Sequence, residues 1–200
     1  MTKSGISAIR LALWGLVLLA LIVLLWFRVI APRLEQDVTA SLGRGDYLLT
    51  ATDGSAFTED SLKGAPSAVF FGFTHCPEVC PTTLGDIATW EEGLGSDAAA
   101  LRVFFVTVDP ERDTVEQLRD YVSWVPEVRG VSGSRADIDK ALKAFRIYAR
   151  RVPLDDGGYT MDHSAMVLLF DARGDYAGLI NYQEDYDRAL GKLQALVAGS

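Results

Sequence analysis

The sequence predicts a mixed α/β domain that follows one long apolar helix near the N-terminus. The first observation is a run of 17 uncharged residues, Leu11 to Phe27, close to the start of the chain. The second is an alternation of short β-rich runs with helical patterns, which is typical of a parallel sheet. The third is a pair of short apolar runs near the C-terminus, separated by DARGD, which predicts an antiparallel hairpin.

The uncharged run is long enough to cross a bilayer. A helix rises about 1.5 Å per residue, so the run and its apolar neighbours approach the roughly 30 Å of hydrocarbon. Trp14 and Trp26 near its ends fit the interfacial positions that tryptophan favours. A cleavable signal peptide is the alternative, but its apolar region usually has about 7–15 residues and ends in an A-x-A-like site. The run IAPRLEQ follows instead, so we expect a membrane anchor over residues 1–33.

Basic residues flank the apolar run on both sides, so the positive-inside rule does not fix its orientation. Everything able to fold follows the run, and translocation of that C-terminal part is the simplest topology.

A composition of 49% hydrophobic and 23% charged residues indicates a folded protein. Beyond Arg33 the chain has 15 basic and 27 acidic residues, a net charge of −12. Phosphate binding needs a basic surface, so this charge argues against a nucleic-acid partner.

The segment after the anchor is expected to be a tether over residues 34–45, because it lacks a strong apolar period. The folded domain is expected to span residues 46–200. The pairs Asp53-Gly54 and Lys63-Gly64 are typical of tight turns and predict a small hairpin at its start. The elements expected after it are a strand over 68–73, a helix ending near Leu94, a strand over 101–108, helices over 114–125 and 137–149, strands over 165–170 and 176–180, and a helix over 185–197.

Cys76 and Cys80 are the two cysteines of the chain, in the run FGFTHCPEVCPTTL. They stand where the first buried strand meets the first helix. A mixed sheet with a cysteine pair at this junction and a late hairpin is the arrangement of the thioredoxin fold, whereas periodicity alone predicts only α/β. If Pro81 occupies the first helical turn, the pair lies in the loop before the helix and both sulfurs can face one side. The helix N-terminus would then favour thiolates, which are reactive and bind metals well.

A metal site would need a third donor besides the two sulfurs. Thiolates select Cu(I), zinc or iron-sulfur centres, but closed zinc and cluster sites commonly take about four protein ligands. His75 is next to Cys76 and would have to fold back to share its metal. His163, in GGYTMDHSAMVLLF, is expected in the loop entering the late hairpin, which in a thioredoxin fold approaches the N-terminus of the active helix. Two sulfurs and one nitrogen would suit copper.

Other interpretations of these residues stay open. Two cysteines in an extracytoplasmic domain are often a structural disulfide, and a redox dithiol is equally compatible with the spacing. A lone histidine is more often a loop residue than a ligand. A bridge over so short a loop would restrict the unfolded chain little, while α/β folds place sites at strand-to-helix junctions. Redox dithiols usually have the spacing Cys-x-x-Cys, and a peroxidase would have no need of His163.

Three motifs together resemble the Sco/SenC family of copper-binding assembly factors for cytochrome c oxidase. They are FGFTHCPEVCPTTL, VTVDPERDT and YTMDHSA, in this order after one apolar helix, and the likeness extends from about Asp46 to the end. The resemblance implies a thioredoxin-like domain facing the periplasm or the mitochondrial intermembrane space. It implies copper ligation by Cys76, Cys80 and His163, with Cu(I), and Cu(II) also open.

The implied task is to deliver copper to the CuA centre of the oxidase, or to keep the cysteines of that centre reduced. The partners would be the copper-bearing subunit of the oxidase, and other copper carriers or thiol reductants. Metal transfer requires no enzymatic turnover, so an enzyme is not the first expectation. The alternative is a thiol-disulfide oxidoreductase that acts through Cys76 and Cys80 on the cysteines of a partner protein.

The sequence departs from the family pattern at Met161, where a smaller aliphatic residue is frequent, and at VSG, residues 131–133, where a Leu-Thr-Gly-like turn is usual. Neither departure touches an expected ligand. Asp109 and Asp113 in DPERDT could orient a ligand or a partner, or could cap the loop before the next helix. For Asp162 we expect a hydrogen bond to the hairpin turn.

Overall fold

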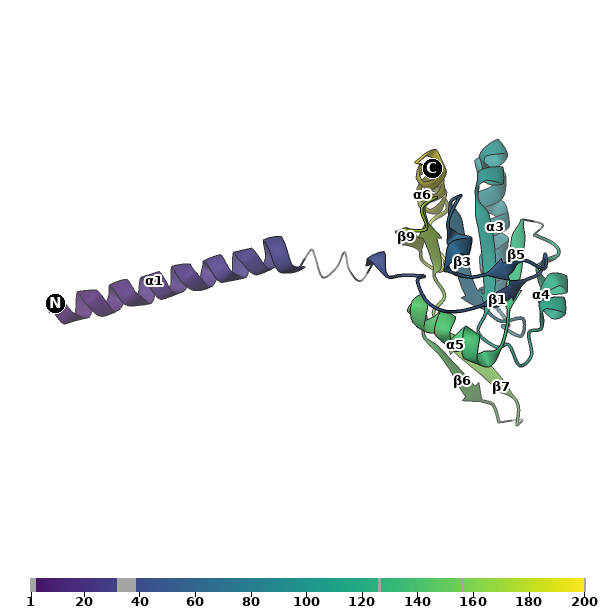
Figure 1. Ribbon diagram of the computed structural model, residues 1–200, viewed down its shortest axis with the longest axis horizontal. Coiled ribbons are helices and arrows are strands. Elements are labelled where there is room, and N and C mark those ends of the chain that lie inside the picture. Colours follow the sequence, from purple (N-terminus) through teal and green to yellow (C-terminus); the bar gives the residue numbers. More distant parts are fainter. Residues whose placement is uncertain (1–2, 32–38, 126, 156, 200) are drawn as a thin grey trace. The chain divides into compact units, whose positions relative to one another are not determined.

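The computed structural model describes residues 3–31, 39–125, 127–155 and 157–199 (Figure 1). The chain divides into two units, residues 1–41 and 42–200, and each is described by itself. Residues 34–38 of the expected tether, and residues 1, 2, 32 and 33 of the expected anchor, lie outside the described ranges. Leu42 and Gly43 already belong to the second unit, where Leu42 packs on the core and the Gly43 N–H donates to the Ala144 carbonyl at 3.0 Å.

The first unit contains one long helical run in its described residues 3–31. Helix α1 covers Lys3–Leu25 and continues as a π-helical segment, η1, over Trp26–Ile30. By length and composition the stretch Leu13–Ile30 can cross a membrane, although a signal sequence passes the same test. No part of this stretch is buried by the rest of the chain.

The second unit has a seven-stranded sheet in the order β2-β1-β5-β4-β3-β8-β9. Strands β3, β4 and β5 run parallel, while β1 and β8 pair with β5 and β3 in the antiparallel sense. The strands are β1 Leu49–Ala51, β2 Ala56–Phe57, β3 Ser67–Gly72, β4 Arg102–Thr107, β5 Val128–Ser132, β8 Val167–Phe170 and β9 Tyr176–Ile180. Every residue of β3 is buried, as expected for a central parallel strand covered on both faces.

Helices connect the strands and cover the sheet. They are α3 Val79–Leu94, α4 Val115–Val122, α5 Arg135–Ala144 and α6 Tyr186–Ala198, with 3₁₀ turns η2 Glu59–Leu62 and η3 Gly95–Ala100. Phe105 of β4 contacts Tyr121 of α4 on one side of the sheet. On the other side Phe71 of β3 contacts Phe145, which follows α5. This mixed sheet with helices on both faces is the expected thioredoxin-like fold.

A second, two-stranded sheet stands apart from the seven-stranded one. Strands β6, Ala149–Pro153, and β7, Tyr159–His163, pair only with each other among the described strands. Figure 1 shows this hairpin extending away from the main sheet next to α5. The main sheet thus supplies one rigid frame, and the hairpin is joined to it through connecting segments and side chains.

Most predicted elements are confirmed, with three corrections. Strand β5 was not predicted, and neither was the β6–β7 hairpin. The helix expected over 137–149 begins at Arg135 and ends at Ala144. Its apolar pattern continues further, but Arg146 adopts a left-handed backbone with φ 55°, which ends the helix and redirects the chain into β6.

Candidate metal centre

Cys76 and Cys80 lie at the junction of β3 and α3, but in different local environments. Cys76 is in the connecting loop and is half-buried. Cys80 is the second residue of α3 and has no exposed surface, so the expectation that both cysteines precede the helix is wrong for Cys80. Pro81, the third residue, falls in the first helical turn as expected, where its missing N–H costs no helical hydrogen bond.

The helix N-terminus brings the two sulfurs together. Glu78 occupies the cap position without a side-chain cap, so the first N–H groups of α3 are not satisfied by that side chain. The backbone N–H of Cys80 donates to Cys76 Sγ at 3.3 Å. Both thiols are free rather than joined in a disulfide. The first turn of α3 therefore places Cys76 Sγ near the partial positive charge of the helix N-terminus, while Cys80 is buried within that turn.

Gly72, the last residue of β3, makes room for the buried sulfur. A Cβ at this position would lie 2.7 Å from Cys80 Sγ and 2.7 Å from Phe105 Cε2. Both distances are far below ordinary van der Waals contact. Only a glycine lets the strand pass this close to Cys80.

Replacing Gly72 by alanine is expected to destabilise the fold by about 1–3 kcal/mol, the usual cost of overpacking a core. The new methyl group must displace the Cys80 side chain or the Phe105 ring. Chemical denaturation measures the loss, and Gly85→Ala on α3 is the matched control because a Cβ there meets nothing within 4 Å. The control should be neutral or up to about 1 kcal/mol more stable through higher helix propensity. Equal stabilities for the two variants would refute the steric role of Gly72.

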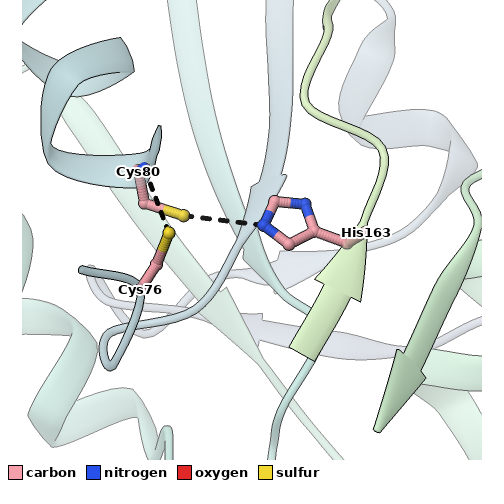
Figure 2. A group of neighbouring side chains, drawn as sticks. All are labelled: Cys76, Cys80 and His163. Carbon is pink, nitrogen blue, oxygen red and sulfur yellow. Dashed lines mark hydrogen bonds between the residues drawn. The ribbon is translucent and has the colours of Figure 1, made fainter. Parts of the chain in front are cut away.

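His163 reaches the cysteine pair from the end of β7. It was expected in a loop, but it is the last residue of the strand. Its Nδ1 lies 2.8 Å from the carbonyl oxygen of Ser164, and a carbonyl only accepts, so Nδ1–H donates and Nε2 keeps its lone pair. Nε2 lies 3.8 Å from Cys80 Sγ (Figure 2). The backbone therefore fixes the tautomer that a metal ligand needs.

The three side chains form one compact cluster. The possible ligand atoms of Cys76, Cys80 and His163 all lie within 4.8 Å of one another. Within the described part of the chain, they are the one group of three or more His, Cys, Asp or Glu side chains arranged to hold a metal. His75 is not in the cluster: its Nδ1 lies 3.0 Å from Thr74 Oγ1 and 3.9 Å from Asp113 Oδ1. The structure thus brings together the three residues singled out from the sequence.

The pKa values of the two thiols are shifted in opposite directions. A hydrogen bond from the Cys80 side chain, with further ones from backbone N–H groups, lowers the pKa of Cys76 to about 4 although burial opposes the shift. The same bond to Cys76, together with burial, raises the pKa of Cys80. At neutral pH the pair therefore has one accessible thiolate and one buried thiol.

The rate at which iodoacetamide labels Cys76 is expected to stay nearly constant between pH 6 and 8. A thiol titrates to the reactive thiolate as pH rises through its pKa, and for Cys76 that change is complete well below pH 6. An ordinary thiol with a pKa near 8.5 would react about tenfold faster per pH unit in this range. Mass spectrometry measures the labelling rate of Cys76 in the folded chain, and the same measurement on the denatured chain gives the rate of an ordinary thiol. A tenfold rise per unit for folded Cys76 would contradict the low pKa.

The two aspartates of DPERDT hydrogen-bond to the segments that carry the cluster residues. Asp113 is fully buried and accepts from the Thr74 N–H at 3.0 Å and from Thr107 Oγ1 at 2.7 Å. Asp109 is also buried and accepts from Arg112 and, at 2.9 Å, from the Tyr159 hydroxyl. The helix cap itself is Thr114, as predicted.

Three supporting residues were not found from the sequence: Gly72, Arg112 and Tyr159. Arg112 stands inside the DPERDT run, which was the one available signal. Asp162, for which we expected a bond to the hairpin turn, has its carboxylate 3.7 Å from Arg150 Nη2 across the β6–β7 pair.

The fold and the cluster define a thioredoxin-like protein with a Cys-Cys-His group at its first strand-to-helix junction. A sequence model of the SCO1/SenC family matches residues 35–198, and the chain belongs to this family. The mitochondrial SCO2 homolog of Danio rerio is 36% identical over 151 residues, which are 74% of this chain and 54% of that protein. The chain thus spans about half to two thirds of the length of the curated relatives it matches.

Solved structures of similar proteins have the same fold. ScoI of Bradyrhizobium japonicum, solved with copper bound, is 40% identical with a TM-score of 0.71, over 78% of this chain and 99% of that chain. Yeast Sco1, also solved with copper bound, is 30% identical with a TM-score of 0.72, over 80% of this chain and 90% of that chain. Structures of relatives with copper thus exist, and the Cys-Cys-His group is present here.

Proposed function

We propose that this chain is a copper-binding assembly factor that delivers copper to the CuA centre of cytochrome c oxidase through Cys76, Cys80 and His163. The observation that carries the proposal is the convergence of two sulfurs and one imidazole nitrogen within 4.8 Å. Two soft sulfur donors favour Cu(I), and three ligands are fewer than a closed zinc or iron-sulfur site takes. The family membership and the copper-bound structures of similar proteins support the same metal.

The arrangement suits a site that must release its metal. Cys80 is buried, whereas Cys76 and His163 are partly exposed and belong to segments far apart in the chain. An incoming donor from an acceptor protein can approach an open position of a three-coordinate ion and replace one ligand at a time. Oxidation of the Cys76 thiolate and the Cys80 thiol to a disulfide, with an oxidised thiol carrier as the electron acceptor, would remove two electrons and one proton and destroy the site. Loading would therefore depend on the redox state.

A thiol-disulfide oxidoreductase is the second candidate, and one observation favours it. An accessible Cys76 with a pKa of about 4 beside a buried Cys80 thiol is also a nucleophile with a resolving partner. In that role Cys76 would attack a disulfide of the partner, and Cys80 would then release the reduced partner by forming the internal disulfide. The same chemistry could keep the cysteines of the CuA centre reduced.

For the location we propose a membrane anchor over residues 1–33 and a tether over residues 34–45. The folded part would face the periplasm, or the intermembrane space in a mitochondrion. The apolar and unburied stretch Leu13–Ile30 supports the anchor. Protection from protease in sealed vesicles of known orientation would test the side of the membrane.

An anaerobic Cu(I) titration of the reduced full chain in detergent is expected to give one copper per chain. His163→Ala should weaken binding at least about tenfold, since loss of even an outer partner of a ligand costs 10–100-fold. His75→Ala is the matched control and should leave the affinity unchanged, because His75 lies outside the cluster. Equal affinities for the parent and His163→Ala would exclude the third ligand. Rapid disulfide exchange by the metal-free chain, without copper binding, would favour the oxidoreductase.

A further inference from the structure

We infer that the segment Asp109–Asp113, called here the bridging loop, sets the position of His163 relative to the cysteine pair, with Arg112 and Tyr159 as positioning residues. The inference rests on the proposed function in taking the three side chains to act on one metal ion. It assigns a task to the DPERDT motif, which the ligand set alone leaves unexplained. The bridging loop joins β4 to α4 and lies between the two segments that carry the ligands.

The first contact fixes the cysteine side of the site. Asp113 accepts from the Thr74 hydroxyl at 2.6 Å and from the Thr74 N–H at 3.0 Å. Thr74 stands two residues before Cys76. The loop that presents Cys76 is therefore held to the bridging loop by a fully buried carboxylate.

The second contact fixes the histidine side. Buried Asp109 accepts from Arg112 Nε and from the Tyr159 hydroxyl, and Arg112 Nη1 donates to the Tyr159 carbonyl at 3.0 Å. The Arg112 guanidinium carbon also lies 3.7 Å from the centroid of the Tyr159 ring, and that of Arg151 lies 3.4 Å from it. Tyr159 is the first residue of β7 and His163 the last. Strand β7, which ends in the expected ligand His163, is thus held to the bridging loop at its first residue, Tyr159.

A third contact passes through Phe73. The Arg112 guanidinium carbon is 5.9 Å from the Phe73 ring centroid, and the Phe73 and His163 rings meet edge to face at 5.7 Å. Phe73 is almost completely buried, so its ring offers the imidazole a fixed surface. Arg112 therefore acts on both ends of β7, directly at Tyr159 and through Phe73 at His163.

These contacts matter because of the topology. The β6–β7 hairpin shares no strand pairing with the seven-stranded sheet in the described residues, so backbone hydrogen bonds between strands do not fix its position. An isolated two-stranded hairpin is marginally stable in water. Side-chain contacts must supply the order, and a buried carboxylate such as that of Asp109 requires its partners. Ala149 and Met161 of the hairpin pack against the hydrophobic core, and the bridging loop adds the polar contacts.

The test compares two conservative variants with a control on the same hairpin. Arg112→Lys keeps a cation near Asp109 but loses the planar guanidinium, whose Nε donates to Asp109 while its Nη1 donates to the Tyr159 carbonyl. Tyr159→Phe keeps the ring and removes the hydroxyl bond to Asp109. Arg150→Gln changes an arginine of β6 that is 65% exposed and faces Asp162. Thermal unfolding confirms that each variant is folded.

The first readout needs no metal and uses ¹⁵N spectra of the His163 ring in the full chain in detergent. The parent and Arg150→Gln should have one form with the proton on Nδ1. Arg112→Lys, and to a smaller extent Tyr159→Phe, should give a mixture of tautomers, because the ring is no longer held against the Ser164 carbonyl. Ring signals identical to those of the parent in both variants would overturn the inference.

The second readout is Cu(I) affinity. Arg112→Lys should bind about tenfold more weakly, the order expected for an outer partner of a ligand, and Arg150→Gln as tightly as the parent. In the His163→Ala background Arg112→Lys should have no further effect, whereas an additive loss would overturn the positioning role. If the parent binds no copper, the proposed function fails, and the ring signals still decide the inference.

Discussion

Cys76→Ser and Cys80→Ser are each expected to lower Cu(I) affinity by more than about 100-fold, beyond what the loss of an outer partner costs. The serine oxygen is a hard donor that a soft ion does not select, so each variant leaves one sulfur and one imidazole. The two changes act on atoms that lie within 4.8 Å of each other and of His163 Nε2. No nearby thiol can substitute, since the chain has two cysteines.

The measurement is the anaerobic titration with a competing chelator, and Thr82→Ser on the exposed side of α3 is the control for a serine in the same helical turn. Chemical denaturation must accompany it for Cys80→Ser, because a hydroxyl there is buried beside Phe105 and Gly72. A folded Cys76→Ser that binds copper as tightly as the parent would eliminate the two-sulfur site.

Asp113→Ala is expected to destabilise the second unit by about 3 kcal/mol or more. The change removes the acceptor of three hydrogen bonds, from the Thr74 N–H, the Thr74 hydroxyl and the Thr107 hydroxyl. Each buried donor left without a partner costs about 1–3 kcal/mol. Against the 5–15 kcal/mol stability of an ordinary domain, this is a large loss.

Urea denaturation measures the effect, and Asp113→Asn should be intermediate because its amide retains one acceptor oxygen. Asp120→Ala, an exposed change on α4, is the control and should lie within about 0.5 kcal/mol of the parent. If Asp113→Ala were as stable as Asp120→Ala, the carboxylate would not hold Thr74.

The central fold could be predicted because its signals are local. The runs that form β3 and β4 are continuous and apolar, and the helical periods of α3 and α4 match the buried faces that the structure shows. Thr114 caps α4 with Gln117, a reciprocal pair that is visible as spacing in the sequence. Such elements need no knowledge of distant contacts.

Strand β5 could not be predicted because its sequence, VRGVS, contains a charge and a glycine. Gly130 suggests a break, yet the structure requires it, since a Cβ there would lie 2.8 Å from Leu118 Cβ of α4. The β6–β7 hairpin is only half-buried, so neither strand has the apolar alternation that marks a strand at the edge of a core. Tertiary packing, and not local preference, determines both elements.

The ligand set could be proposed because the chain has two cysteines and two histidines, which leaves few combinations. The supporting side chains could not, because arginine and tyrosine are ordinary residues. Arg112 and the Tyr159 carbonyl that it binds are 47 positions apart, and only the folded bridging loop brings them into contact. Sequence reasoning finds rare reactive groups more easily than the common ones that orient them.

Cys80 and His163 are 83 positions apart in the chain, which affects when the complete site can form during biogenesis. Contacts between remote positions form late and slowly, because the entropy of closing a long chain loop must be overcome first. A newly made, unstructured chain can offer a soft ion its cysteine pair but not a preassembled third donor. Maturation of the polypeptide therefore precedes tight loading, which limits capture of stray metal before the domain has acquired its native topology.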